Sequence, residues 1–175
     1  LKIVEIEVEE KPTGEISAGA GVSTTGTNIG FGVKENNYLG KGMKVIADIS
    51  FTESTVAGTF SVNNPNFRNS DNSLFTKLSS TIEDRLTKSG YKNTKNAFSI
   101  GSNYEKYKNL YFFPSLEVNY EQLETNSAAS SSLKKQEGNY FDTSFLYTLN
   151  YDQRNQSYQP SDGYQSIFKQ KLPLT

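Results

Sequence analysis

Acidic side chains that stand close together are the first candidates for chemistry in this sequence. Glu83 directly precedes Asp84, and Glu121 lies three residues before Glu124. Two carboxylates with different pKa values can serve as the acid and the base of a hydrolase. Solvated loops, or the inner wall of a water-filled barrel, account for these pairs better than catalysis does, so we expect the protein not to be an enzyme.

Other kinds of site find little support. The chain contains neither His nor Cys, which excludes a Cys nucleophile, a Ser-His pair and the usual zinc site. The spacing of Asp142, Asp152 and Asp162 does not resemble a compact Ca²⁺ loop. The two Gly-x-Gly runs, residues 30–32 and 40–42, lack the strand-to-helix setting of a phosphate site. We therefore predict no metal ion and no cofactor.

Composition predicts an all-β protein. The 22 aromatic residues are 11 Tyr and 11 Phe, which favour strands, and turn-forming residues are frequent. The formal net charge is −1, so nucleic-acid binding has little support. No apolar run approaches the roughly 20 residues of a membrane helix. The negative mean hydropathy is still compatible with a membrane barrel, whose strands alternate apolar and polar residues.

Alternation of apolar and polar residues predicts about nine antiparallel strands after a break at residues 11–14, where Pro12 and Gly14 interrupt an alternating run over residues 1–10. Many of these strands have the length, about 9 to 11 residues, that a tilted strand needs to cross a bilayer. The predicted strands are residues 15–23, 28–34, 44–52, 54–62, 74–83, 97–107, 110–123, 140–152 and 164–172, with a polar loop over 85–95 and a Ser- and Ala-rich loop over 125–139.

The connections and the chain ends suggest part of a larger barrel. Short turns after Ser23, Thr52 and Tyr107, with long loops around Arg85 and Ser130, resemble the short periplasmic turns and long outer loops of membrane barrels. An odd number of strands leaves unpaired edges in lipid, so either the chain is a fragment, which we favour, or other chains complete it. The chain starts without Met or a basic leader, so we expect the export signal to lie upstream.

Tyrosines near predicted strand ends suggest an aromatic girdle at the lipid interface, although the rim of a β-sandwich would look similar. They are Tyr104, Tyr107, Tyr111, Tyr147, Tyr151 and Tyr158.

Several segments resemble the BamA family of outer-membrane assembly factors. The run VEEKPTGEISAGAGVSTTG over residues 8–26, followed by ENNYLGKG over residues 35–42, resembles the junction between the last polypeptide-transport-associated (POTRA) domain and the first barrel strand. Asn-Pro-Asn-Phe at residues 64–67 agrees in order and spacing. So does Tyr-Asp at residues 151–152, followed by Pro-Ser-Asp-Gly-Tyr at residues 160–164. The resemblance covers essentially the whole chain.

The resemblance implies an antiparallel transmembrane β-barrel of 16 strands, of which this chain would supply the N-terminal nine. Residues 1–11 would end the last periplasmic POTRA domain, and residues 12–175 would form the N-terminal part of the barrel in the bacterial outer membrane. The implied function is assembly and insertion of β-barrel proteins. The implied partners are unfolded outer-membrane protein clients, accessory outer-membrane lipoproteins, periplasmic chaperones and the lipid bilayer.

The first barrel strand is the implied site, because in this family it parts from the last strand and pairs with a client strand by β-augmentation. Its many small residues would make it a weak strand, although glycine could equally relieve crowding where the barrel bends. The implied site residues are Glu15, Ile16, Ser17, Ala18, Gly19, Ala20, Gly21, Val22 and Ser23. Two alternatives stay open: an outer-membrane translocation or secretion pore of a related family, and a soluble β-sandwich binding module.

Overall fold

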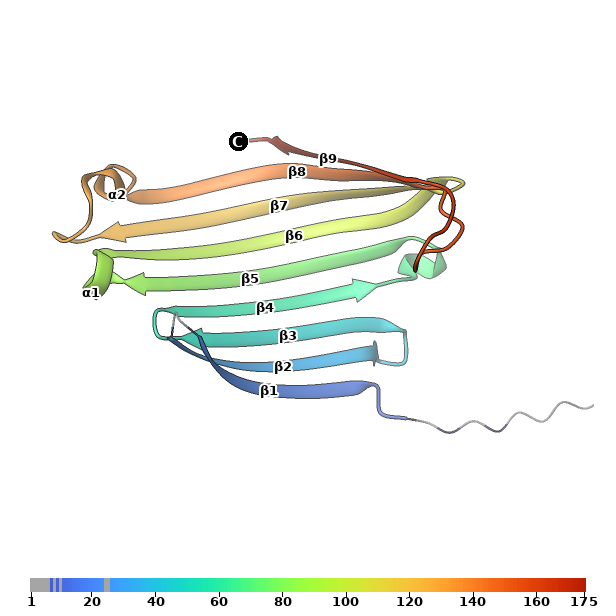
Figure 1. Cartoon of the computed structure of the whole chain (residues 1–175), viewed down its shortest axis with the longest axis horizontal. Coiled ribbons are helices and arrows are strands. Elements are labelled where there is room, and N and C mark those ends of the chain that lie inside the picture. Colours follow the sequence, from blue (N-terminus) through green and yellow to red (C-terminus); the bar gives the residue numbers. More distant parts are fainter. Residues whose placement is uncertain (1–6, 8, 10, 24–25) are drawn as a thin grey trace, which may run out of the picture.

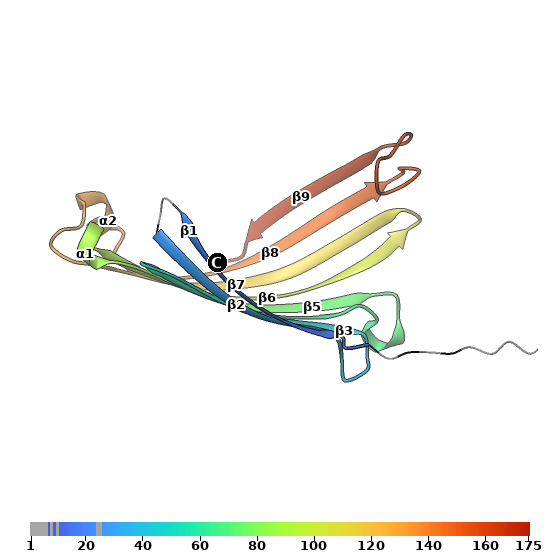
Figure 2. The same cartoon turned by 60° about the horizontal axis from the view of Figure 1, so that its bottom comes forward.

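Nine antiparallel strands form a single sheet in the computed structural model, which describes residues 7, 9, 11–23 and 26–175. Each strand pairs with its neighbours in chain order, and the sheet is twisted and curved (Figures 1 and 2). The strands are β1 (Gly14–Ser23), β2 (Gly26–Tyr38), β3 (Met43–Thr52), β4 (Thr55–Asn64), β5 (Ser73–Arg85), β6 (Tyr91–Tyr107), β7 (Leu110–Thr125), β8 (Gly138–Asp152) and β9 (Gln165–Pro173). Three short helices lie in the connections: η1 (Phe67–Asn69), α1 (Leu86–Ser89) and α2 (Ser131–Lys135).

Strand register gives the sheet one apolar and one polar face, because successive side chains of a strand point to opposite sides. A row of directly paired residues crosses the apolar face from β1 to β8: Ala18, Phe31, Ile49, Gly58, Ser80, Asn96, Tyr120 and Phe141. The adjacent row on the polar face contains Ser17, Gly32, Asp48, Thr59, Ser79, Ala97, Asn119 and Asp142.

The two faces differ in exposure. Large apolar side chains of the apolar face are open to the surroundings, with Phe60 at 45% and Leu78 at 52%. The buried strand residues among those described, Gly32, Gly101 and Ser144, all belong to the polar face. This is the inverse of a water-soluble sheet, and it matches a barrel wall with lipid outside and a polar interior.

The predicted strand series is confirmed, with differences at strand ends. The region predicted as a loop over 85–95 contains α1 and the first part of β6, which begins at Tyr91. The Ser- and Ala-rich loop over 125–139 contains α2, whose N-cap Ser130 accepts a hydrogen bond from the Leu133 amide. The alternating run over residues 1–10, which is typical of a strand, lies mostly outside the described residues, as do Thr24 and Thr25 of the first turn. The described Glu7 and Glu9 are not in a strand.

Loop length does not separate the two ends of the sheet as the sequence suggested. The connections 53–54, 86–90 and 126–137 lie at the end that carries α1 and α2, and 39–42, 65–72, 108–109 and 153–164 lie at the other end (Figure 1). Each end thus has a two-residue turn and a twelve-residue loop.

Contacts between loops tie the α1–α2 end together. Lys88 Nζ of α1 lies 2.8 Å from Glu53 Oε2 in the β3–β4 turn. Asn126 of the β7–β8 loop donates from Nδ2 to the Leu86 carbonyl at 2.9 Å and from its backbone N–H to the Gly90 carbonyl at 2.8 Å. Three connections far apart in sequence therefore form one connected rim.

The expected tyrosine girdle is realised only in part. Tyr104, Tyr147 and Tyr151 share the apolar face, where the Tyr104 and Phe112 rings meet edge to face with centroids 5.7 Å apart. Tyr111 lies instead on the polar face, and Tyr158 lies in the β8–β9 loop. Among the described residues no helix is long and apolar enough to span a bilayer.

Candidate functional site: the edge strand

The nine residues singled out from the sequence all lie in β1, together with Gly14. Ile16, Ala18, Ala20 and Val22 belong to the apolar face, and Ile16 and Val22 are 87% and 88% exposed. Glu15, Ser17, Gly19 and Gly21 belong to the polar face. The alternation read from the sequence is therefore the alternation of the folded strand.

The side chains that pair β1 with β2 are small at two positions of the polar face. Ten consecutive residue pairs join the two strands, but Gly19 faces Gly30 and Gly21 faces Asn28. Cross-strand side-chain contacts are the main source of pairing strength beyond the backbone ladder. Among the described residues, a Cβ added at Gly19 or Gly21 would meet no atom within 4 Å, so crowding within this nine-stranded sheet requires neither glycine.

Polar contacts concentrate at the Gly14 end of the pair. Lys34 Nζ of β2 lies 3.1 Å from Glu15 Oε1, and the Asn36 backbone N–H donates to the Thr13 carbonyl at 3.1 Å. Ser17 Oγ donates to the Gly32 carbonyl at 3.4 Å. The sequence pattern did not single out Lys34 or Asn36, although Lys34 continues the alternation of its strand.

The bond between Asn36 and Thr13 sets the phase of the backbone ladder. Residues opposite each other in an antiparallel pair alternate between hydrogen-bonded and non-bonded positions. Thr13 bonds to Asn36 across the pair. The backbone N–H and C=O groups two, four and six positions further on, at Glu15, Ser17 and Gly19, therefore also point toward β2. The backbone N–H and C=O groups of the intervening residues point to the other edge of β1: Gly14, Ile16, Ala18, Ala20 and Val22.

The outer edge of β1 has no strand beside it in the described part of the chain, where β1 pairs with β2 alone. The same is true of β9 at the opposite edge. A row of outward-pointing N–H and C=O groups is a ready template for a further strand.

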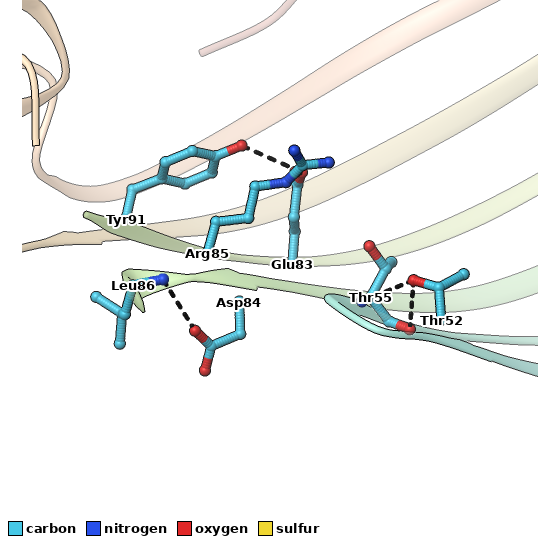
Figure 3. Close-up of polar contacts among 7 residues, drawn as sticks. All are labelled: Thr52, Thr55, Glu83, Asp84, Arg85, Leu86 and Tyr91. Carbon is cyan, nitrogen blue, oxygen red and sulfur yellow. Dashed lines mark hydrogen bonds and ion pairs between the residues drawn. The ribbon is translucent and has the colours of Figure 1, made fainter. Parts of the chain in front are cut away.

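The first acidic pair is engaged in local structure. Glu83 and Asp84 point to opposite sides of the sheet, and Glu83 Oε1 lies 2.6 Å from Arg85 Nε and 3.1 Å from the Tyr91 hydroxyl (Figure 3). Asp84 Oδ1 accepts the backbone N–H of Leu86 at 3.1 Å, at the start of α1 (Figure 3). The Thr52 and Thr55 contact in the same view closes the β3–β4 turn. The two carboxylates do not share a cleft, as acid–base catalysis would need.

The other acidic residues behave similarly. Glu121 Oε1 lies 3.2 Å from Lys95 Nζ and accepts from Asn93 at 2.8 Å. Asp152 Oδ2 lies 2.7 Å from Arg154. Asp162 Oδ1 accepts the backbone N–H of Gly163 at 2.7 Å. Within the described ranges no group of three acidic, His or Cys side chains could hold a metal ion.

The fold and the edge strand together define the class of protein. A curved antiparallel sheet with an apolar outer face, a polar inner face and strands of 9 to 17 residues is the wall of a transmembrane β-barrel.

Comparison with known proteins gives the family. Residues 37–174 match the model of the Omp85 superfamily domain, and the chain belongs to this superfamily. A solved structure with the same fold is described as the crystal structure of BamA from Haemophilus ducreyi lacking POTRA domains 1–3; the TM-score is 0.68 at 21% sequence identity. A comparison with curated protein sequences gave no match.

The structural match covers 95% of this chain and 35% of the BamA chain. The chain thus spans about a third of that protein, and it matches a portion of its barrel. The resemblance seen in the sequence agrees with the Omp85 superfamily and with the fold of BamA, and the protein is placed in the bacterial outer membrane.

Proposed function

We propose that the protein assembles β-barrel proteins and inserts them into the outer membrane, without enzymatic chemistry, and that β1 is the strand with which a client pairs. The observation that carries the proposal is the outer edge of β1. Its outward backbone groups belong to Gly14, Ile16, Ala18, Ala20 and Val22, and no described strand covers them.

The mechanism would be β-augmentation. An incoming client strand accepts and donates backbone hydrogen bonds along the edge of β1, so recognition depends little on client sequence. The small side chains of Ala18, Gly19, Ala20 and Gly21 leave room for varied client side chains on both faces.

The membrane supplies the driving force. An unpaired backbone group in hydrocarbon costs several kcal/mol, because no water is present to bond it. The edge of β1 must therefore pair with some strand, either the barrel's own closing strand or a client's. Weak side-chain packing along β1 makes exchange between the two less costly.

The partners follow from this role. We propose unfolded outer-membrane protein clients, delivered by periplasmic chaperones, and accessory outer-membrane lipoproteins as further partners. We also propose that residues 1–11 end a periplasmic POTRA domain and that residues 12–175 belong to the barrel.

A translocation or secretion pore is the second candidate function. It is favoured by the polar face of the sheet, where the small residues Ser17, Gly32, Thr59 and Ser79 lie in one row. A water-filled interior of this kind suits passage of an unfolded chain.

Reconstitution in liposomes separates the two functions. The complete protein would be reconstituted with an unfolded client barrel, and client folding followed by heat-modifiable gel mobility. A disulfide that locks β1 to the closing strand is the control. Client folding that is faster than in empty liposomes and is abolished by the lock supports assembly. Ion conductance without faster folding supports the pore.

A further inference from the structure

A hollow of about 440 Å³ lies on the polar face of the sheet between β5 and β9. Four large apolar side chains line it: Phe75, Phe113, Leu146 and Ile167. All four are in phase with the polar-face residues of their strands, so they point into the barrel interior and not toward lipid. The interior of a membrane barrel is normally polar, because water fills it. An apolar hollow is therefore unexpected in this wall.

A glycine of β6 makes room for the hollow. A Cβ added at Gly101 would lie 2.5 Å from Cζ of Phe75 and 2.7 Å from the Pro114 carbonyl oxygen, so the Phe75 ring occupies the space above this buried glycine. The ring of a β5 residue thus reaches across β6 toward β7. It is thereby brought beside the apolar side chains of β7, β8 and β9.

The hollow lies near the end of the sheet where β1 begins. Its apolar members on β5, β7 and β9 lie within three residues of the starts of these strands. The starts of β1, β5, β7 and β9 all lie at the end opposite α1 and α2 (Figure 1). With residues 1–11 assigned to the periplasm, the hollow is near the periplasmic opening of the barrel, which is the side from which clients arrive.

Positive charge flanks the hollow on both sides. Lys169 of β9 lines it, and Lys77 lies on the same face of β5, two residues beyond Phe75. Neither lysine forms an ion pair with a described residue. The carboxylates of this face in the same half of the sheet already have partners: Glu105 accepts the Asn109 backbone N–H, Glu117 bonds to Lys171, and Asp152 bonds to Arg154. The two lysines therefore favour an occupant that carries negative charge.

We propose that the hollow binds segments of unfolded clients in which an apolar side chain is followed by an acidic one. Strands of membrane barrels alternate apolar and polar residues, so an unfolded client offers this combination repeatedly. The apolar side chain leaves water for the hollow, which supplies attraction in proportion to the area buried, and the neighbouring carboxylate meets Lys169 or Lys77. The hollow begins four strands away from β1, so it would hold a client inside the barrel before the client pairs with β1.

Peptide binding to the complete protein in nanodiscs tests the chemistry of the site. Three short fluorescent peptides of equal length would be compared by anisotropy: one alternates Leu with Glu, one Leu with Lys, and one Ser with Glu. Ile167→Ser removes an apolar side chain that is 52% exposed, and Lys169→Gln removes one charge. Ile46→Ser and Lys44→Gln make the same changes on the polar face of β3, outside the hollow, and are the matched controls.

The wild type and both β3 variants are expected to bind the Leu–Glu peptide more tightly than either other peptide, by roughly 3- to 10-fold. Ile167→Ser should weaken this binding by a similar factor, and Lys169→Gln by about 2- to 5-fold, as for an exposed ion pair. Heat-modifiable mobility confirms that each variant is folded. Equal binding of the three peptides by the wild type would overturn the proposal, and so would equal weakening by Ile167→Ser and Ile46→Ser. Failure of a water-soluble maleimide to label Ile167→Cys would also overturn it, because the protein's own chain would then cover the hollow.

Client crosslinking separates this site from the proposed assembly function, on which it rests. Ile167→Cys in the complete protein would be combined with an unfolded client that carries single cysteines, and disulfides would be scored before the client folds. Disulfides at position 167 are expected, and the Leu–Glu peptide should reduce them. Disulfides from β1 but none from position 167 would overturn the hollow and leave assembly standing. Loss of both, with no acceleration of client folding, would overturn the assembly function as well.

Discussion

Proline substitution in β1 can separate the two edges of the strand. Proline has no backbone N–H, and it is tolerated in an edge strand where that N–H would face away from the ladder. The ladder phase places the Ala18 N–H on the outer edge and the Gly19 N–H toward Gly30 of β2. We therefore expect Ala18→Pro to leave the β1–β2 ladder intact and Gly19→Pro to break it.

The two substitutions are expected to change different quantities: Ala18→Pro the rate of client folding, and Gly19→Pro the stability of the barrel. Ala18→Pro removes one hydrogen bond to the client, worth about 1 kcal/mol, which corresponds to roughly fivefold slower client folding if pairing limits the rate. Gly19→Pro leaves the Gly30 carbonyl without its donor and should destabilise the barrel by about 1–3 kcal/mol. Ala18→Val keeps the N–H and is the control for side-chain bulk.

Two assays on the reconstituted complete protein read out these effects. Client folding is followed by gel mobility, and barrel stability is followed by the temperature at which the protein itself loses its folded mobility. Client folding by Ala18→Pro at the rate of Ala18→Val would refute the edge-pairing mechanism. A smaller loss of stability in Gly19→Pro than in Ala18→Pro would refute the deduced phase of the ladder.

Three further substitutions test the rim and the strength of β1. Gly90 has φ +76°, and a Cβ there would lie 2.2 Å from the Ala129 backbone nitrogen. Gly90→Ala should therefore destabilise the rim by about 1–3 kcal/mol. The rate of protease cleavage in the β7–β8 loop measures this loss. The hydrogen bond and charge of Lys88 lower the pKa of Glu53 below its usual 4.5, so this pair stabilises the rim above that pH. The same protease should therefore cleave the wild type more slowly than Glu53→Gln near neutral pH. This difference in cleavage rate should disappear as the pH falls below the ordinary carboxyl range, and a difference that does not change with pH would contradict the role of the pair. Gly21→Val, which meets open space, should stabilise β1 by about 0.5–1 kcal/mol, raise the melting temperature and slow client folding.

Strands within the membrane were readily predicted from the sequence, and their extensions beyond it were not. Residues 91–95 were taken as loop because they are polar, yet Lys92 faces Glu124 and Lys95 faces Glu121 in a continuous ladder. Alternation identifies a strand only where one face must be apolar. Where a strand rises above the bilayer, backbone pairing continues without that constraint.

Site residues followed the same division. The members of β1 are contiguous, so their alternation and small size could be read directly. A hollow on the apolar face is lined by Gly58, Ser80, Asn96 and Tyr120, which only strand register brings together. No local pattern marks that combination. The outward phase of the β1 backbone likewise depends on one cross-strand bond that the sequence does not reveal.

Cysteine crosslinking during client folding tests most directly whether β1 is the strand that clients join. The chain contains no native cysteine, so single cysteines at Ala18 or Ala20 on β1, or at Ser61 on β4 as a control, are unambiguous. Each would be combined with a client that carries single cysteines along its terminal strand. We predict disulfides from positions 18 and 20 to client positions two residues apart in an antiparallel or parallel register, and none from position 61. Crosslinks at position 61 with none in β1 would contradict the account.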